Sequence, residues 1–315
     1  MSLIKCLASI SLAVIALPTL HSQPHCPGNA ASIRFHVVQR SRIIVPVVIN
    51  STGPYEFLVD TGTGSTIVDP VLATELHLKT RGSAEVVGVG FSTYGSFAYV
   101  DLLETGSHSV ANHPVEVQDL QPLQAADLHF RGIIGGDFLG HFDVLMDYAH
   151  RMLCLDDTKG MQAAVKGGHI ALVTPSLTPN EVSLTTLLII PVHLSGFGAR
   201  QLLLTLDSGA NASFLFNHAV NLAPGLRQTR QRNGYGADGV KRGFSILPPQ
   251  SMQIGSLNIQ QVSFAVPADS GENTLTSRQD GLLATVVFRR VFISYADRFV
   301  VLDPWQGGIL GAELP

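Results

Sequence analysis

Charged residues are scarce in this sequence, and neither sign of charge predominates. Asp, Glu, Lys and Arg make up 14% of the 315 residues, well below the roughly 25% typical of soluble proteins. The formal net charge of −4 offers no basic surface of the kind that binds nucleic acid, so no nucleic acid partner is expected. The length accommodates two domains of ordinary size, each able to bury a core.

Long apolar runs are missing beyond the N-terminus, so we expect no membrane span in the mature chain. In residues 1–22, by contrast, Lys5 is the only charge, an apolar run covers residues 7–17, and small or polar residues follow. This order is typical of a secretory signal peptide cleaved near Ser22, and the alternative is a buried N-terminal segment. The sequence therefore predicts a secreted or periplasmic protein.

Cysteine is rare, and loss of the signal peptide would leave only Cys26 and Cys154. In an exported protein these two residues could form one disulfide or remain two unpaired thiols, and the sequence leaves both alternatives open. The histidines show no metal-ligand spacing such as H-E-x-x-H, so we expect no metal and no other cofactor.

Glycine is abundant, with 30 residues, and Val, Thr and Ser recur in short runs. This composition favours short strands and turns and predicts an all-β fold. The clearest helix candidate covers residues 69–78, with Asp69 as the N-cap and Pro70 at the first helical position. A second short helix is expected around Phe138.

Two stretches place an acid at the end of an apolar strand. Residues 57–68 read FLVDTGTGSTIV, and residues 202–215 read LLLTLDSGANASFL, so Asp207 follows Asp60 by 147 residues. An ionised carboxylate at such a position is costly unless something pairs with it or uses it. Two acids in the same local context suggest that they share one site.

The similarity between the two halves extends on both sides of these acids. IIVPVVIN at 43–50 matches LIIPVHLS at 188–195, and GIIGGDFLGHFDVLMDYAHRMLCLD at 132–156 matches DGLLATVVFRRVFISYADRFVVLDP at 280–304. A whole domain is therefore repeated. We expect a signal peptide at 1–22, one lobe at 33–158, a linker at 159–180 rich in Gly, Pro, Ser and Thr, a second lobe at 181–304, and a tail at 305–315.

These motifs together resemble the aspartic proteases. Asp60-Thr61-Gly62, the Gly-rich hairpin around Gly88 and the GIIGGDFL block followed by Asp147-Tyr148 are similar to the bacterial retropepsin-like aspartyl proteases, once per lobe. The resemblance implies two homologous acid-protease-type β-barrel lobes in one chain, forming a bilobal, pseudo-two-fold molecule. It also implies an aspartic endopeptidase that hydrolyses peptide bonds of extended polypeptides and works as a monomer.

In that family two carboxylates share one proton, and Asp60 and Asp207 are the matching catalytic residues here. Two such groups about 3 Å apart cannot both ionise, so one acts as the base for a water and the other as an acid. The resemblance gives supporting roles in the active-site loops to Thr61, Gly62, Ser208 and Gly209.

Two hairpins are candidate flaps that would fold over a bound peptide. The hairpin of the first lobe carries Tyr94, and the matching hairpin of the second lobe offers Tyr235. The alternative is that both are ordinary hairpin aromatics that pack on their own sheets.

The second lobe departs from the family pattern at two positions. Ala284 stands where the first lobe has Gly135, and Asn211 stands where it has Gly64. An added methyl beneath the catalytic loop could shift Asp207. The alternative to the enzyme is therefore a peptide-binding pseudoprotease with a degraded second lobe. It would be favoured if the two carboxyl groups lay beyond hydrogen-bonding reach of each other.

The sequence also admits two further alternatives. The DTGTGS motif at 60–65 also resembles the phosphate loop of actin-like ATPases, but the alternating helices and strands of that fold are absent after it. A dimer in which each chain contributes only Asp60 would also supply two carboxylates, and measurement of molecular size in solution would reveal it.

Overall fold

The computed structural model describes residues 25–28, 30–88, 91–124, 129–173, 187–221, 223, 230–235, 240–268 and 279–305. The predicted signal peptide lies outside these residues, as do residues 174–180 of the predicted linker and 306–315 of the tail. Strands dominate the described part of the chain, and its few helices are short. The predicted all-β fold class is confirmed.

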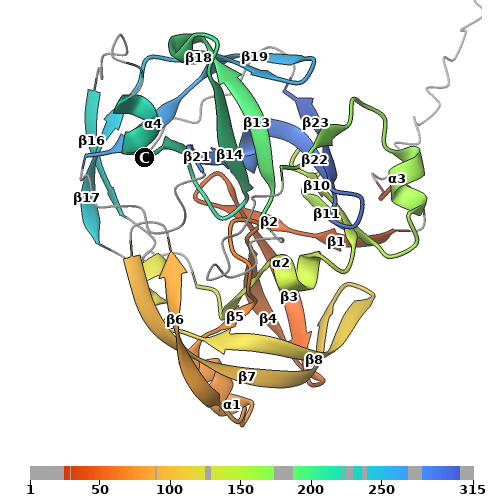
Figure 1. The fold of residues 1–315 in the computed structure, drawn as a ribbon. Coiled ribbons are helices and arrows are strands. Elements are labelled where there is room, and N and C mark those ends of the chain that lie inside the picture. Colours follow the sequence, from red (N-terminus) through yellow and green to blue (C-terminus); the bar gives the residue numbers. More distant parts are fainter. Residues whose placement is uncertain are drawn as a thin grey trace, which may run out of the picture.

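An eight-stranded sheet forms the first lobe, which lies at the bottom of Figure 1. Its order is β2-β3-β4-β9-β5-β8-β7-β6. The strands are β2 (His36–Val38), β3 (Arg42–Ile49), β4 (Thr52–Val59), β5 (Ile67–Val68), β6 (Arg81–Gly88), β7 (Phe91–Thr105), β8 (His108–Val117) and β9 (Gly132–Ile134).

A nine-stranded sheet forms the second lobe, at the top of Figure 1. Its order is β16-β17-β20-β15-β21-β14-β13-β18-β19. The strands are β13 (Ile189–Leu194), β14 (Gln201–Asp207), β15 (Ser213–Leu215), β16 (Arg230–Tyr235), β17 (Lys241–Ile246), β18 (Gln250–Ile254), β19 (Leu257–Val262), β20 (Phe264–Pro267) and β21 (Gly281–Ala284).

A six-stranded sheet draws on both halves of the chain, in the order β1-β11-β10-β22-β23-β12. Its strands are β1 (Ala31–Arg34), β10 (Asp143–Asp147), β11 (Met152–Asp156), β12 (Ile170–Ala171), β22 (Phe288–Ser294) and β23 (Phe299–Pro304). Strand β10 of the first half pairs antiparallel with β22 of the second, so backbone hydrogen bonds join the halves directly. Because β10 and β11 are buried along their whole length, this sheet forms part of a core that continues into both lobes.

The two lobes repeat the same strand pairings around their acid-bearing strands. Strand β4 pairs parallel with β9, and β14 pairs parallel with β21. Next to them β5 pairs antiparallel with β9 and parallel with β8, while β15 pairs antiparallel with β21 and parallel with β20. The repeat seen in the sequence thus corresponds to a repeat in topology, which gives both acids equivalent places in their sheets.

The helices are short and mark the ends of strands. They are α1 (Pro70–Glu75), α2 (Gly136–Leu139), α3 (Gly160–Ala164) and α4 (Asn217–Asn221), with 3-10 turns η1 (Gln121–Leu123), η2 (Ser195–Phe197) and η3 (Thr285–Val287). The carboxylate of Asp69 accepts from the backbone N–H of Leu72, which is the N-cap expected for α1. Helix α1 ends three residues before the predicted boundary, since His77 adopts a positive φ.

The segment predicted as a linker contains regular structure in its described part. Helix α3 buries Met161, whose backbone N–H donates to Asp156, and β12 extends the six-stranded sheet by pairing with β23. The composition of this segment, rich in Gly, Pro, Ser and Thr, suggested a linker. One buried methionine and one strand pairing attach the described part of this segment to the sheet.

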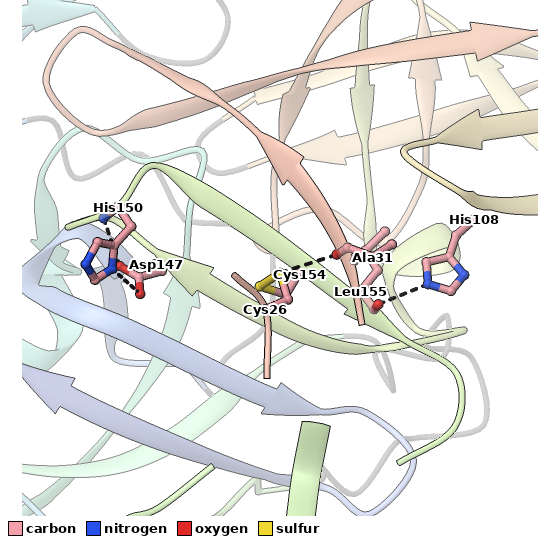
Figure 2. Close-up of a disulfide and its surroundings, with 7 residues drawn as sticks. All are labelled: Cys26, Ala31, His108, Asp147, His150, Cys154 and Leu155. Atoms are coloured by element: carbon pink, nitrogen blue, oxygen red, sulfur yellow. Dashed lines mark hydrogen bonds and ion pairs between the residues drawn. A yellow bond between two sulfur atoms is a disulfide. The ribbon is translucent and has the colours of Figure 1, made fainter. Parts of the chain in front are cut away.

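Cys26 and Cys154 form a disulfide, with an S–S distance of 2.04 Å (Figure 2). Cys154 lies in β11, and Cys26 lies just before β1, the antiparallel neighbour of β11. Both sulfurs are buried in a small apolar cluster with Met161 and Phe292. The bond ties the N-terminal segment to the sheet that joins the halves.

No helix among the described residues is long and apolar enough to cross a membrane.

Candidate active site

Asp60 and Asp207 occupy the same place in their lobes, at the ends of β4 and β14. Each is followed by a tight turn whose backbone N–H groups point back at the carboxylate. Gly62 donates to Oδ1 of Asp60 at 2.7 Å, and Gly209 and Ala210 donate to Oδ1 of Asp207 at 2.8 and 2.9 Å. Apolar residues before each acid are buried, so the turns are anchored to the core and the carboxylates are held in place.

Two hydroxyl side chains cross between the lobes directly beneath the acids. Thr61 Oγ1 donates to the carbonyl of Leu206 at 2.8 Å, and Ser208 Oγ donates to the carbonyl of Val59 at 2.7 Å. Each hydroxyl oxygen also accepts from the other residue's backbone N–H at 3.1 Å. Four reciprocal hydrogen bonds, all buried, therefore fix the two loops against each other.

Two glycines allow each loop to approach the opposite carboxylate. A Cβ at Gly62 would lie 2.7 Å from Cγ of Asp207, and a Cβ at Gly209 would lie 2.4 Å from Cγ of Asp60. Any side chain at either position would overlap the acid of the other lobe. Glycine is thus required here because of close packing between the lobes, which adds to the sharp turn suggested by the sequence.

The two carboxyl groups lie within reach of each other and are joined by a side-chain hydrogen bond. Burial, followed by the negative charge of Asp60, raises the pKa of Asp207 well above its ordinary value. Burial also raises the pKa of Asp60, although the Gly62 N–H, the bond with Asp207 and the charge of Arg42 oppose the rise. Such a pair takes up and releases protons as a unit and can hold one proton between two oxygens near neutral or acidic pH.

Arg42, at the start of β3, is a site residue that the sequence reasoning missed. Its Nε donates to the backbone carbonyl of Gly209 at 2.8 Å, and its charge acts on both Asp60 and Asp207. The sequence offers one indication of this role, which is the position of Arg42 relative to the repeat. Arg42 directly precedes the repeated IIVPVVIN block, where the second lobe has Leu187.

The loops are supported from below by matching hydroxyls. In the first lobe Thr66 Oγ1 accepts from the N–H of Gly135 at 3.3 Å and donates to Asp137 at 2.6 Å. In the second lobe Ser213 Oγ accepts from the N–H of Ala284 at 3.1 Å. These supports were also not anticipated, because a buried Thr or Ser in an apolar strand resembles ordinary strand composition.

The substitution at Ala284 leaves Asp207 in its expected register. A Cβ at Gly135 would lie 2.3 Å from the Ser65 carbonyl oxygen, so the first lobe requires glycine there. Ala284 has φ −61° and ψ 126°, whereas Gly135 has φ −99° and ψ −175°. The different backbone angles accommodate the methyl group, and Asp207 still pairs with Ala284 between β14 and β21. Asn211 is partly buried in the second loop.

The repeated tyrosines Tyr148 and Tyr295 are buried at the ends of β10 and β22, near the acids of the opposite lobes. The hydroxyl of Tyr148 bonds Thr285 Oγ1 at 2.6 Å. Tyr295 is the corresponding residue across the pseudo-two-fold axis, where the first lobe has Gly136 in the place of Thr285. Its hydroxyl has no hydrogen-bond partner among the described residues. Burial raises the pKa of both phenols, so they are neutral over the range in which the carboxyls ionise.

The structure describes the side chain of one flap candidate, Tyr94, and only the backbone position of the other, Tyr235. Tyr94 lies on β7 opposite Glu85 of β6 and is 77% exposed, so it does not pack on its own sheet. The hairpin that carries it ends at Gly88 and Phe91. Tyr235 ends β16 opposite Lys241, and its side chain lies outside the described part of the structure.

Among the described residues no three His, Cys, Asp or Glu side chains are grouped so as to hold a metal ion.

Comparison with known proteins finds a similarity in the first lobe. Residues 45–138 match the family model described as aspartyl protease, a range that contains Asp60, Thr61, the β6–β7 hairpin and Asp137. No curated protein matches the chain. On that match the first lobe is similar to the aspartyl protease family.

Proposed function

We propose that this protein is an aspartic endopeptidase in which Asp60 and Asp207 together activate a water molecule. The observation that carries this proposal is the pair itself. Two carboxyls come from equivalent turns, Asp207 buried and Asp60 partly buried, and each is faced by the glycine of the opposite loop. The raised pKa of Asp207, caused by burial and by the charge of Asp60, supports a dyad that retains one proton.

The chemistry follows from one ionised and one protonated carboxyl. The ionised group takes a proton from a water whose oxygen attacks the scissile carbonyl carbon, while the protonated group donates its proton to the carbonyl oxygen. The resulting tetrahedral diol collapses when its C–N bond breaks. The leaving nitrogen takes the proton gained from water, and a diol hydroxyl returns a proton to the other carboxyl, so the dyad is restored.

The proposed substrate is an extended polypeptide bound between the lobes. The β6–β7 hairpin offers backbone groups for pairing with a peptide strand, and the exposed ring of Tyr94 can cover a bound side chain. Tyr235 has the corresponding proposed role in the second lobe. Because one chain supplies both acids, we propose that the active unit is a monomer.

We further propose that the protein is secreted or periplasmic. The signal-like segment at 1–22 motivates this, and the disulfide between Cys26 and Cys154 is consistent with an oxidising compartment. Export can be tested by expressing the full chain and sequencing the N-terminus of the protein recovered outside the cytoplasm. Recovery of only intact, cytoplasmic protein would contradict it.

The decisive experiment measures peptide cleavage across pH for wild type, Asp60→Asn and Asp207→Asn, with and without pepstatin. Asp101→Asn, which replaces an exposed acid on β7, is the matched control. We expect cleavage at acidic to mildly acidic pH in wild type and the control, inhibition by pepstatin, and loss of at least about 10³-fold in both dyad variants. Equal activity in all four proteins would overturn the proposal. Loss in Asp60→Asn alone would make the second lobe structural.

A further inference from the structure

The pseudo-two-fold symmetry of the site is broken at one charged position. Arg42 precedes the first strand of the repeated block in the first lobe, and Leu187 holds the matching place in the second. Leu187 is 6% exposed and belongs to the apolar core. Among the described residues, the guanidinium of Arg42 therefore lies on one side of the pair of acids with no counterpart at the matching position on the other side.

Arg42 is held by two hydrogen bonds that fix its orientation. Its Nη1 donates to Oε1 of Gln39 at 2.7 Å, within its own lobe, and its Nε donates to the carbonyl of Gly209 at 2.8 Å, in the other lobe. The peptide that it holds is the one wedged between the two carboxyls. The N–H of Gly209 bonds Asp207, and its Cα faces the Asp60 carboxylate so closely that a Cβ would overlap it.

The charge of Arg42 lies on the side of the site where the Gly209 peptide meets Asp60. Arg42 bonds the carbonyl of Gly209, whose Cα faces the Asp60 carboxyl, and its positive charge favours ionisation of Asp60. The other titratable groups facing the dyad from described elements are Tyr148 on the β10 side and Tyr295 on the β22 side, both neutral phenols. A guanidinium stays protonated in proteins, so Arg42 is the one permanent charge among these groups.

We propose that Arg42 is a positioning residue of the dyad, which holds the Gly209 peptide against Asp60 and keeps Asp60 as the ionised member, so that the shared proton resides on Asp207. This inference rests on the proposed proteolytic function. It assigns the roles within the pair: Asp60 takes the proton from water, and Asp207 donates its proton to the substrate carbonyl.

The test compares the pH dependence of kcat/KM in wild type, Arg42→Leu and Arg42→Lys. Arg42→Leu introduces the residue found at the matching position of the second lobe and removes the charge. Ionisation of the dyad then requires a higher pH. The acidic limb of the kcat/KM profile, its rise on the low-pH side, should therefore move to higher pH by about one pH unit. Arg42→Lys keeps the charge and restores the position of that limb. Its kcat is expected to fall, because Lys lacks the planar fork that bonds Gly209 and Gln39 together.

Two controls separate this effect from a general loss of charge or packing. Arg34→Leu removes an exposed charge on β1, and Gln39→Ala removes the support of Nη1 while keeping the guanidinium. Both should leave the acidic limb where it is in wild type. An unchanged limb in folded Arg42→Leu would overturn the proposal, as would an equal shift in Arg34→Leu.

A measurement without turnover keeps this proposal distinct from the proteolytic one. Carboxyl ¹³C shifts of Asp60 and Asp207 can be titrated in wild type and in Arg42→Gln, which serves if Arg42→Leu does not fold. We expect Asp60 to ionise first in wild type and its titration to move to higher pH in Arg42→Gln. Ionisation of Asp207 first in wild type would refute the assignment, whereas inactivity of wild type with the expected titration would refute only the proteolytic function.

Discussion

Gly209→Ala tests whether the close approach between the lobes is what forms the dyad. The added Cβ would lie 2.4 Å from both Cγ and Oδ2 of Asp60, more than 1 Å inside the ordinary separation of about 3.5–4.0 Å between non-bonded carbons. The loops cannot simply move apart, because Thr61 and Ser208 fix them by four buried hydrogen bonds. The Asp60 carboxyl must therefore shift or rotate.

The expected magnitude separates activity from stability. Displacement of a reacting group by about 1 Å can cost 10²-fold in rate, so kcat should fall by at least about 10²-fold. Overpacking typically destabilises by about 1–3 kcal/mol, and for a chain of this length each kcal/mol lowers Tm by roughly 2–4 °C. Gly62→Ala should have a smaller effect of the same kind, since its Cβ would lie 2.7 Å from Asp207 Cγ.

The assay measures peptide cleavage and thermal unfolding of both variants beside Gly168→Ala. At Gly168 the nearest atom to an added Cβ is Ser256 Oγ at 3.7 Å, an ordinary contact. Because alanine restricts the unfolded chain, that control should be fully active and unchanged or slightly more stable. The reasoning about interlobe packing fails if folded Gly209→Ala keeps wild-type kcat/KM within a few fold, or if Gly168→Ala loses as much activity.

The other predictions concern the crossed hydroxyls, the disulfide and the buried acid. Thr61→Val and Ser208→Ala should each destabilise by about 1–3 kcal/mol, because each leaves buried N–H and C=O groups unpaired; unchanged Tm in both would contradict the crossed bonding. Replacing Cys26 and Cys154 by Ser should lower the free energy of unfolding by about 3–5 kcal/mol, given the separation of 128 residues, and equal stability of oxidised and reduced wild type would refute this. Burial and the charge of Asp60 raise the pKa of Asp207 in the folded protein. The stability that protonated Asp207 contributes is therefore fully present below the pKa that Asp207 has in the unfolded chain, and it is lost as the pH rises through its pKa in the folded protein. Asp207→Asn should therefore raise Tm more at pH 7 than at pH 3, and calorimetry that finds the reverse order would contradict the shift.

Much of the site could be derived from local patterns. An apolar strand that ends in an acid, a hydroxyl residue and glycine determines the turn at each carboxylate, and Asp69-Pro70 determines where α1 begins. The end of α1 was predicted too late, because the positive φ of His77 has no strong sequence signal. The sequence predicted a linker at 159–180, and its composition did not reveal that Met161 within it is buried.

The sequence by itself determined the fold class and predicted that Asp60 and Asp207 share one site, because a repeated pattern places equivalent residues in equivalent local structures. Only the tertiary structure decided which atoms meet across the lobes. The approach of Arg42 to Gly209, 167 residues away, depends on how two packed units dock, and no local periodicity encodes that geometry. The same docking places Gly62 and Gly209 against the carboxylates of the opposite lobes. It thereby brings two acids from different lobes into one site.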